Sequence, residues 1–222
     1  TIHKGLALFG SADGWVYCLR AADGVLAWRF RASDADIRMV SHQQVESVWP
    51  VPGSILVVND NAYFAAGRTS YLDGGMRLFK LDPRTGRLLR SSTLYDRDPT
   101  TGVVPPENAK GKDLTPAALP DVLSSDGKSI FLRHRRFDLD CNPVAEDAPH
   151  IFSAIGFVDD SWWQRHYQVY SPSTRSGFGD WYKPANQAPS GRLIALHEGT
   201  VYGFGRTTPL DCFDNFAGLN LK

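Results

Sequence analysis

The 222-residue sequence lacks any apolar run that approaches the ~20 residues of a membrane-spanning helix. It also lacks an excess of either charge, since 24 lysines and arginines are balanced by 24 aspartates and glutamates. A chain without net charge has no broad electrostatic field to attract nucleic acid or anionic lipid. The composition therefore predicts neither membrane insertion nor a nucleic-acid partner.

Cysteine is scarce, and its three copies are far apart. Cys18, Cys141 and Cys212 show neither the spacing of metal ligands nor that of a redox pair. Because at most one disulfide can form, cysteine usage does not fix the cellular compartment, and we expect buried free thiols. The six histidines have no i, i+4 or i, i+2 pair, which argues against a zinc site. Phosphate-loop, dinucleotide and nucleophile-elbow motifs are also missing.

What the sequence does contain is a regular series of turn signals. The stretch "GSADGWVYCLRAADGVLAWRF" separates apolar runs by "SADG" and "AADG". Glycine accepts a positive φ and aspartate hydrogen-bonds its own backbone, so both segments are typical of tight turns. The runs Leu6–Gly10, Trp15–Arg20 and Val25–Phe30 are therefore predicted to form an antiparallel meander.

A similar pattern returns between residues 62 and 94. Aligning the two copies places Leu19 over Leu81 and Gly24 over Gly86 at the same offset. The second copy carries about five extra residues near "RTSYLDGG", where we expect a solvated turn that exposes Arg68, Tyr71 and Asp73. Weaker hairpins are predicted across residues 125–127 and 198–199.

Repeated short meanders predict an array of small sheets. One such sheet cannot bury both faces, whereas radial packing of several sheets can, as in a β-propeller. A sandwich or a barrel is the alternative, but neither explains why the same turn chemistry recurs. We expect an all-β fold of about four blade equivalents in one domain over residues 1–222. The first blade is expected to lack its first strand, and residues 33–48 are the best candidate for a helical turn.

The repeat resembles that of pyrroloquinoline-quinone-like (PQQ-like) β-propellers. In that repeat a Gly-x-x-Asp-Gly turn precedes a strand ending in Ala-Leu-Asp, then Thr-Gly, then a tryptophan four residues later. The first copy matches at Gly10, Asp13, Gly14, Leu19, Gly24 and Trp28. The second copy matches at Leu81, Asp82, Thr85 and Gly86, but Arg90 replaces the tryptophan. The resemblance implies four-stranded antiparallel blades, with Trp28 as an anchor between blades, within a larger propeller.

The same resemblance implies a bacterial protein that is periplasmic or secreted. Quinone-dependent alcohol dehydrogenases of this fold use calcium, an aspartate base and often a disulfide between adjacent cysteines, which this sequence lacks. We therefore expect a non-catalytic scaffold, without a cofactor or metal, that binds a protein or carbohydrate partner. Two alternatives stay open, namely part of a PQQ- and calcium-dependent oxidoreductase and a structural domain of a multidomain enzyme.

The least repeat-like stretch is "GFVDDSWWQRHYQVY", and "SGFGDWYKPANQAPSG" follows it. Aromatic faces beside carboxylates and an arginine can bind a sugar or a planar ligand by stacking and hydrogen bonding. The alternative is that these aromatic side chains pack between blades or beneath a long loop. The candidate ligand-binding residues are Asp159, Asp160, Trp162, Trp163, Arg165, His166, Tyr167, Trp181 and Tyr182.

Overall fold

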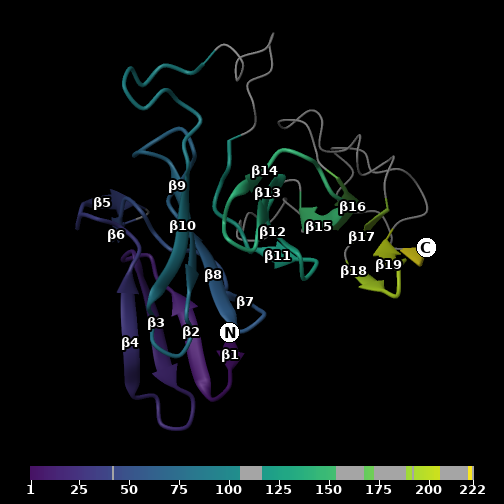
Figure 1. The fold of residues 1–222 in the computed structure, drawn as a ribbon, viewed down its shortest axis with the longest axis horizontal. Coiled ribbons are helices and arrows are strands. Elements are labelled where there is room, and N and C mark those ends of the chain that lie inside the picture. Colours follow the sequence, from purple (N-terminus) through teal and green to yellow (C-terminus); the bar gives the residue numbers. More distant parts are fainter. Residues whose placement is uncertain are drawn as a thin grey trace.

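The computed structural model describes residues 1–41, 43–105, 117–153, 168–172, 189–191, 193–205 and 220–221. All regular structure within these ranges is β-strand, and none of it is helix. The strands form a series of separate antiparallel sheets along the chain (Figure 1). We call the five sheets with three or four described strands blades and number them in chain order.

The first blade is a complete four-stranded sheet. Its strands lie in sequence order and are β1 (Ile2–His3), β2 (Leu6–Gly10), β3 (Trp15–Arg20) and β4 (Leu26–Arg31). The expectation that this blade lacks its first strand is wrong, because β1 pairs Ile2 with Ala7 and His3 with Leu6. A strand of two residues is too short for an alternating pattern to reveal it.

The second and third blades also have four strands each. The second contains β7 (Leu56–Val58), β8 (Asn61–Ala66), β9 (Met76–Leu81) and β10 (Leu88–Leu94). The third contains β11 (Ser124–Ser125), β12 (Ser129–Leu132), β13 (Arg135–Asp138) and β14 (Pro143–Val144). The predicted hairpin across residues 125–127 is confirmed, since β11 pairs with β12.

The fourth and fifth blades each have three described strands. They contain β15 (His150–Ser153), β16 (Gln168–Ser171) and β17 (Ser190–Gly191), then β18 (Leu193–His197), β19 (Thr200–Gly205) and β20 (Asn220–Leu221). The predicted turn at residues 198–199 joins β18 to β19. The expected fold class, an all-β chain of propeller-type antiparallel blades, is confirmed.

Residues 33–48 form a hairpin, so the expected helical turn is wrong. Strands β5 (Arg38–Ser41) and β6 (Gln44–Ser47) pair with each other as a separate two-stranded sheet. Val40 lies opposite Val45 in this ladder, and β-branched side chains favour strands over helices. Gln43 adopts a φ of 65° and thereby turns the chain back on itself.

The second blade is buried on both faces. Alternation along β8 sends Phe64 into an apolar cluster with Leu8 and Val16 of the first blade. It sends Tyr63 into a second cluster with Ile130 of the third blade. Because each sheet face meets the opposite face of the next sheet, the blades stack side by side rather than around one shared core.

The two copies of the repeat have the same backbone register. A bulge lies between the Cys18–Trp28 and Leu19–Leu26 pairs of the first blade, and another between the Lys80–Arg90 and Leu81–Leu88 pairs of the second. The irregularity therefore occurs at equivalent places, which confirms the alignment of Leu19 with Leu81.

Candidate functional site

The nine candidate ligand-binding residues predicted from the sequence lie outside the described residues, as does Cys212. Candidate sites must therefore be found elsewhere in the part of the chain that the structure describes. Three regions carry distinctive side chains, namely the contacts between blades, a cavity between the first strands of three blades, and the loops at one end of the blades.

Trp28 joins the first blade to the second, as the sequence predicts. Its indole N–H donates a hydrogen bond to the carbonyl oxygen of Pro83, with 3.0 Å between nitrogen and oxygen. The ring covers Gly86, whose φ is +69°, and a Cβ built at that glycine would lie 2.7 Å from the ring. Trp28 thus rests on the turn between β9 and β10, and only a residue without a side chain fits beneath it.

The second blade is joined to the third in a related way but by different residues. The hydroxyl of Tyr63 donates to the carbonyl oxygen of Leu139 at 2.9 Å, and Lys80 Nζ lies 2.9 Å from Asp140 Oδ1. Leu139 follows Asp138 as Pro83 follows Asp82, so the two accepting carbonyls occupy equivalent turn positions. The second blade has Arg90 where the first has Trp28, and Tyr63 supplies the hydrogen-bond donor in its place.

Cys141 occupies the turn position that Gly86 holds in the second blade. Its φ of 66° is close to the 69° of Gly86, although cysteine has a side chain. The thiol is fully buried and unpaired, and burial raises its pKa to about 11. This third turn could not be recognised from the sequence, because "DLDCN" lacks the glycine that marks the other two turns.

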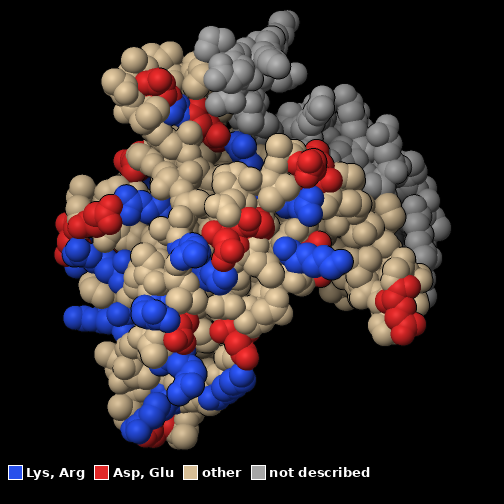
Figure 2. All heavy atoms as spheres, viewed as in Figure 1, with Lys and Arg blue, Asp and Glu red and all other residues tan. Residues whose placement is uncertain are grey.

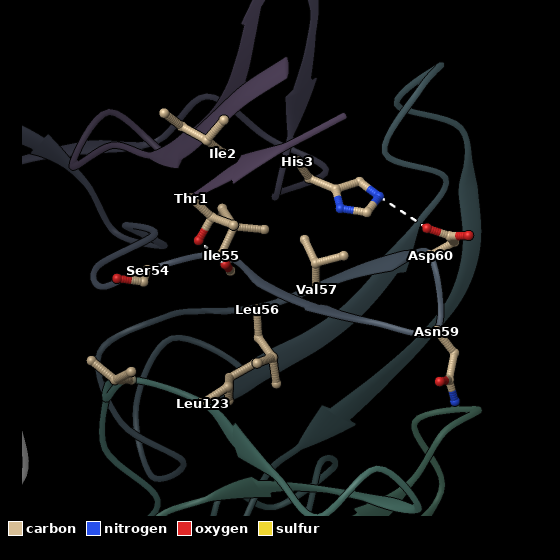
Figure 3. A pocket seen from close by; sticks show the side chains of 11 residues that line it. Thr1, Ile2, His3, Ser54, Ile55, Leu56, Val57, Asn59, Asp60 and Leu123 are labelled. Carbon is tan, nitrogen blue, oxygen red and sulfur yellow. Dashed lines mark hydrogen bonds and ion pairs between the residues drawn. The ribbon is translucent and has the colours of Figure 1, made fainter. Parts of the chain in front are cut away.

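A cavity of about 700 Å³ lies where the first strands of three blades approach one another (Figure 3). Its walls are formed by β1, by β7 with its flanking residues, and by the segment before β11; the lining residues are Thr1, Ile2, His3, Ser54, Ile55, Leu56, Val57, Asn59, Asp60, Val122 and Leu123. Figure 3 shows His3 pointing toward Asp60, with 3.0 Å between Nε2 and the carboxylate.

The chemistry of this cavity is limited. Lys4 also contacts the Asp60 carboxylate at 2.7 Å, and its hydrogen bond lowers the pKa of that carboxyl group. The remaining wall is mixed: Ile55 and Leu123 are buried in it, and Thr1, Ser54 and Asn59 add polar groups. Within the described ranges, no group of three or more His, Cys, Asp or Glu residues could hold a metal ion. The cavity therefore has a wall of mixed polarity with one imidazole–carboxylate pair, and its lining does not select a particular kind of ligand.

The turn near residues 68–75 is solvated only in part, because Asp73 is exposed as expected from the sequence whereas Arg68 and Tyr71 are partly buried. Arg68 Nη2 lies 2.8 Å from Glu46 Oε2 on β6, and both side chains are mostly buried. The indole N–H of Trp49 donates to the carbonyl oxygen of Asp73 at 2.9 Å. A cavity of about 420 Å³ beside this ion pair is lined by Ala12, Ser41, Glu46, Pro50, Pro52, Arg68 and Pro120.

The β5–β6 hairpin extends from these loops (Figure 1). It also exposes apolar side chains. The exposed apolar residues of the hairpin and of the residue before it, with the exposed fraction of each, are Ile37 at 50%, Met39 at 37%, Val40 at 73% and Val45 at 63%. The face in Figure 2 shows acidic and basic side chains interspersed. Among the loops near residues 33–50 and 68–75, the exposed apolar hairpin is the most distinctive feature.

The sequence matches no family model and no curated protein. Among solved structures it is similar to a europium-containing methanol dehydrogenase, with a TM-score of 0.40 and 12% identity over 67% of this chain and 24% of that one. It is also similar to BamB from Moraxella catarrhalis, with a TM-score of 0.39 and 13% identity over 91% of this chain and 52% of that one. A computationally designed protein, Ika8, follows with a TM-score of 0.21 and 12% identity over 64% of this chain and 43% of that one.

The chain thus spans about a quarter and about half of the lengths of the first two proteins. The sheet order and strand register described above, rather than these matches, establish the fold. No helix in the described part of the chain is long and apolar enough to cross a membrane.

Proposed function

We propose that this chain is a non-catalytic scaffold that binds a protein partner through its β5–β6 hairpin. The observation that carries the proposal is the exposure of Val40 and Val45, which pair with each other across a two-stranded sheet, and of Ile37 directly before its first strand. Exposed apolar side chains that lie together mark interaction sites in many proteins. Among the strands that the structure describes, β5 and β6 pair with no other, so a partner strand can also add to one of their edges.

The base of the β5–β6 hairpin is anchored to the first and second blades by hydrogen bonds and an ion pair. The backbone N–H of Ser47 donates to the carbonyl oxygen of Ala12 in the first blade at 2.9 Å. Arg68 of the second blade contacts Glu46 by the ion pair and also donates to the Ser47 carbonyl oxygen at 3.4 Å. Anchoring to two blades reduces the entropy that the hairpin loses when a partner binds.

The kind of partner, the cellular location and the repeat family expected from the sequence stay proposals. A carbohydrate partner would depend on the aromatic residues at positions 162, 163, 181 and 182, which lie outside the described ranges. A periplasmic or secreted location and membership of the PQQ-like repeat family depend on the resemblance of the repeat. An oxidoreductase that uses PQQ and calcium, or a structural domain of a larger enzyme, is the alternative function.

Site-specific photo-crosslinking in cells tests the proposed protein interaction. A benzophenone amino acid is placed at Val40, and a matched control carries it at Arg84, an exposed residue in the β9–β10 turn. We expect a discrete higher-mass adduct from position 40 that is lost when Val45 is also changed to aspartate. Equal adducts from positions 40 and 84, or none from position 40, would contradict the proposal.

The oxidoreductase alternative has its own test. The purified chain is incubated with PQQ and calcium, and its absorbance and thermal midpoint are recorded. A bound quinone spectrum together with a calcium-dependent rise in the midpoint would favour the oxidoreductase over the scaffold.

A further inference from the structure

The cavity of about 420 Å³ lies between the base of the β5–β6 hairpin and the loops of the first three blades. Ser41 and Glu46 line it from the hairpin, and alternation places them on the face of the ladder opposite Val40 and Val45. The cavity therefore lies on the other side of the hairpin from the apolar residues that the proposed partner would contact. Its volume falls within the range of ligand sites, roughly 300–1,000 Å³.

Prolines form most of the apolar wall of this cavity. Pro50 and Pro52 line it from the segment before β7, and Pro120 lines it from the segment before β11. The backbone N–H of Gly67 donates to the carbonyl oxygen of Pro50 at 3.0 Å, and the N–H of Val51 donates to the turn between β2 and β3, also at 3.0 Å. Because proline rings are rigid and this segment is held on two sides, the wall is preformed for a ligand.

The charged side chains in the lining, Glu46 and Arg68, neutralise each other. Arg68 Nη2 lies 2.8 Å from Glu46 Oε2, and the two side chains are only 24% and 17% exposed. Both hydrogen bonds that Arg68 donates to described residues start at Nη2, and the second ends on the carbonyl oxygen of Ser47. A guanidinium has five N–H donors and a carboxylate has two oxygens, so the pair keeps further donors beside an acceptor.

This combination selects one chemical class of ligand. Because the ion pair has no net charge, it does not compensate the desolvation of a charged ligand of either sign. A planar amide matches the pair, since its carbonyl oxygen accepts from the guanidinium while its N–H donates to the carboxylate. A flat aromatic ring buries much apolar area against the rigid proline rings.

We propose that this cavity binds an uncharged aromatic amide, the group that an aromatic residue carries within a peptide chain. The ring packs among Pro50, Pro52 and Pro120, and the amide bridges Arg68 and Glu46. The same chemistry can come from a peptide segment or from a free small molecule. This inference does not rest on partner binding by the hairpin, because Val40 and Val45 lie on the other face.

A titration of the 222-residue chain followed by NMR tests the proposal. The probe is N-acetylphenylalanine amide, and the comparators are N-acetylphenylalanine, which is an anion, phenylalanine amide, which is a cation, and N-acetylalanine amide, which lacks the ring. We expect the probe to saturate the protein and each comparator to bind at least roughly tenfold more weakly. Absence of saturable binding by the probe, or equal binding of a charged comparator, would overturn the proposal.

A longer ligand distinguishes the two sources of the amide. It is a peptide with phenylalanine between two glycines on each side, capped at both ends. Binding as tight as that of the probe marks a peptide segment as the ligand, whereas binding at least roughly tenfold weaker marks a free small molecule.

Two variants of the lining locate the site. Ala12→Trp fills the cavity without removing the ion pair, so it should abolish binding of the probe. Glu46→Gln leaves Arg68 without its carboxylate, so the preference should switch from the probe to the anion N-acetylphenylalanine. Asp36→Asn is the matched control, because it removes a carboxylate from an ion pair outside the cavity and should not change the preference.

Unchanged binding in Ala12→Trp, or the wild-type preference in a folded Glu46→Gln protein, would overturn the assignment of the site. The comparison of ligands on the wild type does not depend on how either variant folds.

Discussion

Two neighbouring interfaces between blades use equivalent backbone carbonyls as acceptors but different side chains as donors. Trp28 donates to Pro83 across the first interface, and Tyr63 donates to Leu139 across the second. Tyr63 is 1% exposed, whereas its partner residue Leu139 is partly buried. The contact between blades therefore requires a side-chain donor long enough to reach the turn carbonyl, and this donor need not be a tryptophan at one fixed position.

Conservative removal of each donor should therefore cost a similar amount of stability. We expect Trp28→Phe and Tyr63→Phe each to lower the free energy of unfolding by about 1–2 kcal/mol, because each leaves a carbonyl without its donor. The double variant should be additive, since the two contacts share no partner. Urea unfolding measures these values, and a Tyr63→Phe variant as stable as the wild type would show that the second contact contributes nothing.

The buried thiols of Cys18 and Cys141 should not react with thiol reagents while the protein is folded. Burial raises the pKa of both Cys18 and Cys141, so almost no thiolate is present at pH 8. In a Cys212→Ser background, we expect no reaction with a thiol reagent at pH 8 until denaturant is added. Rapid labelling of either thiol in the folded protein would mean that these side chains are accessible.

The turns between third and fourth strands hold ionised carboxylates. Asp138 is desolvated by burial, which alone would raise its pKa, but hydrogen bonds from Asn142 and from backbone N–H groups outweigh this and lower the pKa. The carboxylate thus contributes stability fully above its unfolded pKa of about 3.9. That contribution is lost as the pH falls through the lower pKa of the folded state.

An acid titration of stability tests this turn. Between pH 5 and pH 2 the thermal midpoint of the wild type should fall more steeply than that of an Asp138→Asn variant. Some slope should remain in the variant, because Asp82 in the preceding blade also has a lowered pKa. Parallel curves for the two proteins would mean that Asp138 does not contribute in the way described.

Strand and turn prediction succeeded where residues carry a local signal. The "SADG", "AADG" and "LDPRTG" turns could be recognised because glycine and aspartate determine backbone geometry over a few residues. The strand β1 was missed because its two residues show no alternation. The hairpin at residues 38–47 was predicted as a helical turn. Its position depends on contacts with loops of two blades, which local sequence does not reveal. The turn at Cys141 was missed because tertiary packing holds a cysteine in a conformation typical of glycine.

The side-by-side stacking of blades followed from the repeat, but the detailed contacts did not. The sequence indicated Trp28 as an anchor, because tryptophan recurs at that place in the family that the repeat resembles. Nothing in it indicated that Tyr63 and Lys80 replace the tryptophan in the next blade, since that exchange occurs across strands far apart in the chain. The exposed apolar hairpin was likewise not predicted, and the predicted ligand residues lie outside the described ranges.

The stacking of one blade on the next depends most directly on Trp28 lying over Gly86. The decisive measurement is the cost of Gly86→Ala in unfolding free energy, in the wild type and in a Trp28→Ala background. Gly24→Ala is the control, because Gly24 has a φ of +71° but nothing within 4 Å of a built Cβ. We expect Gly86→Ala to cost at least ~1 kcal/mol more in the wild type than without the tryptophan, where its cost should equal that of Gly24→Ala. Equal costs of Gly86→Ala in both backgrounds would contradict the stacking of these blades.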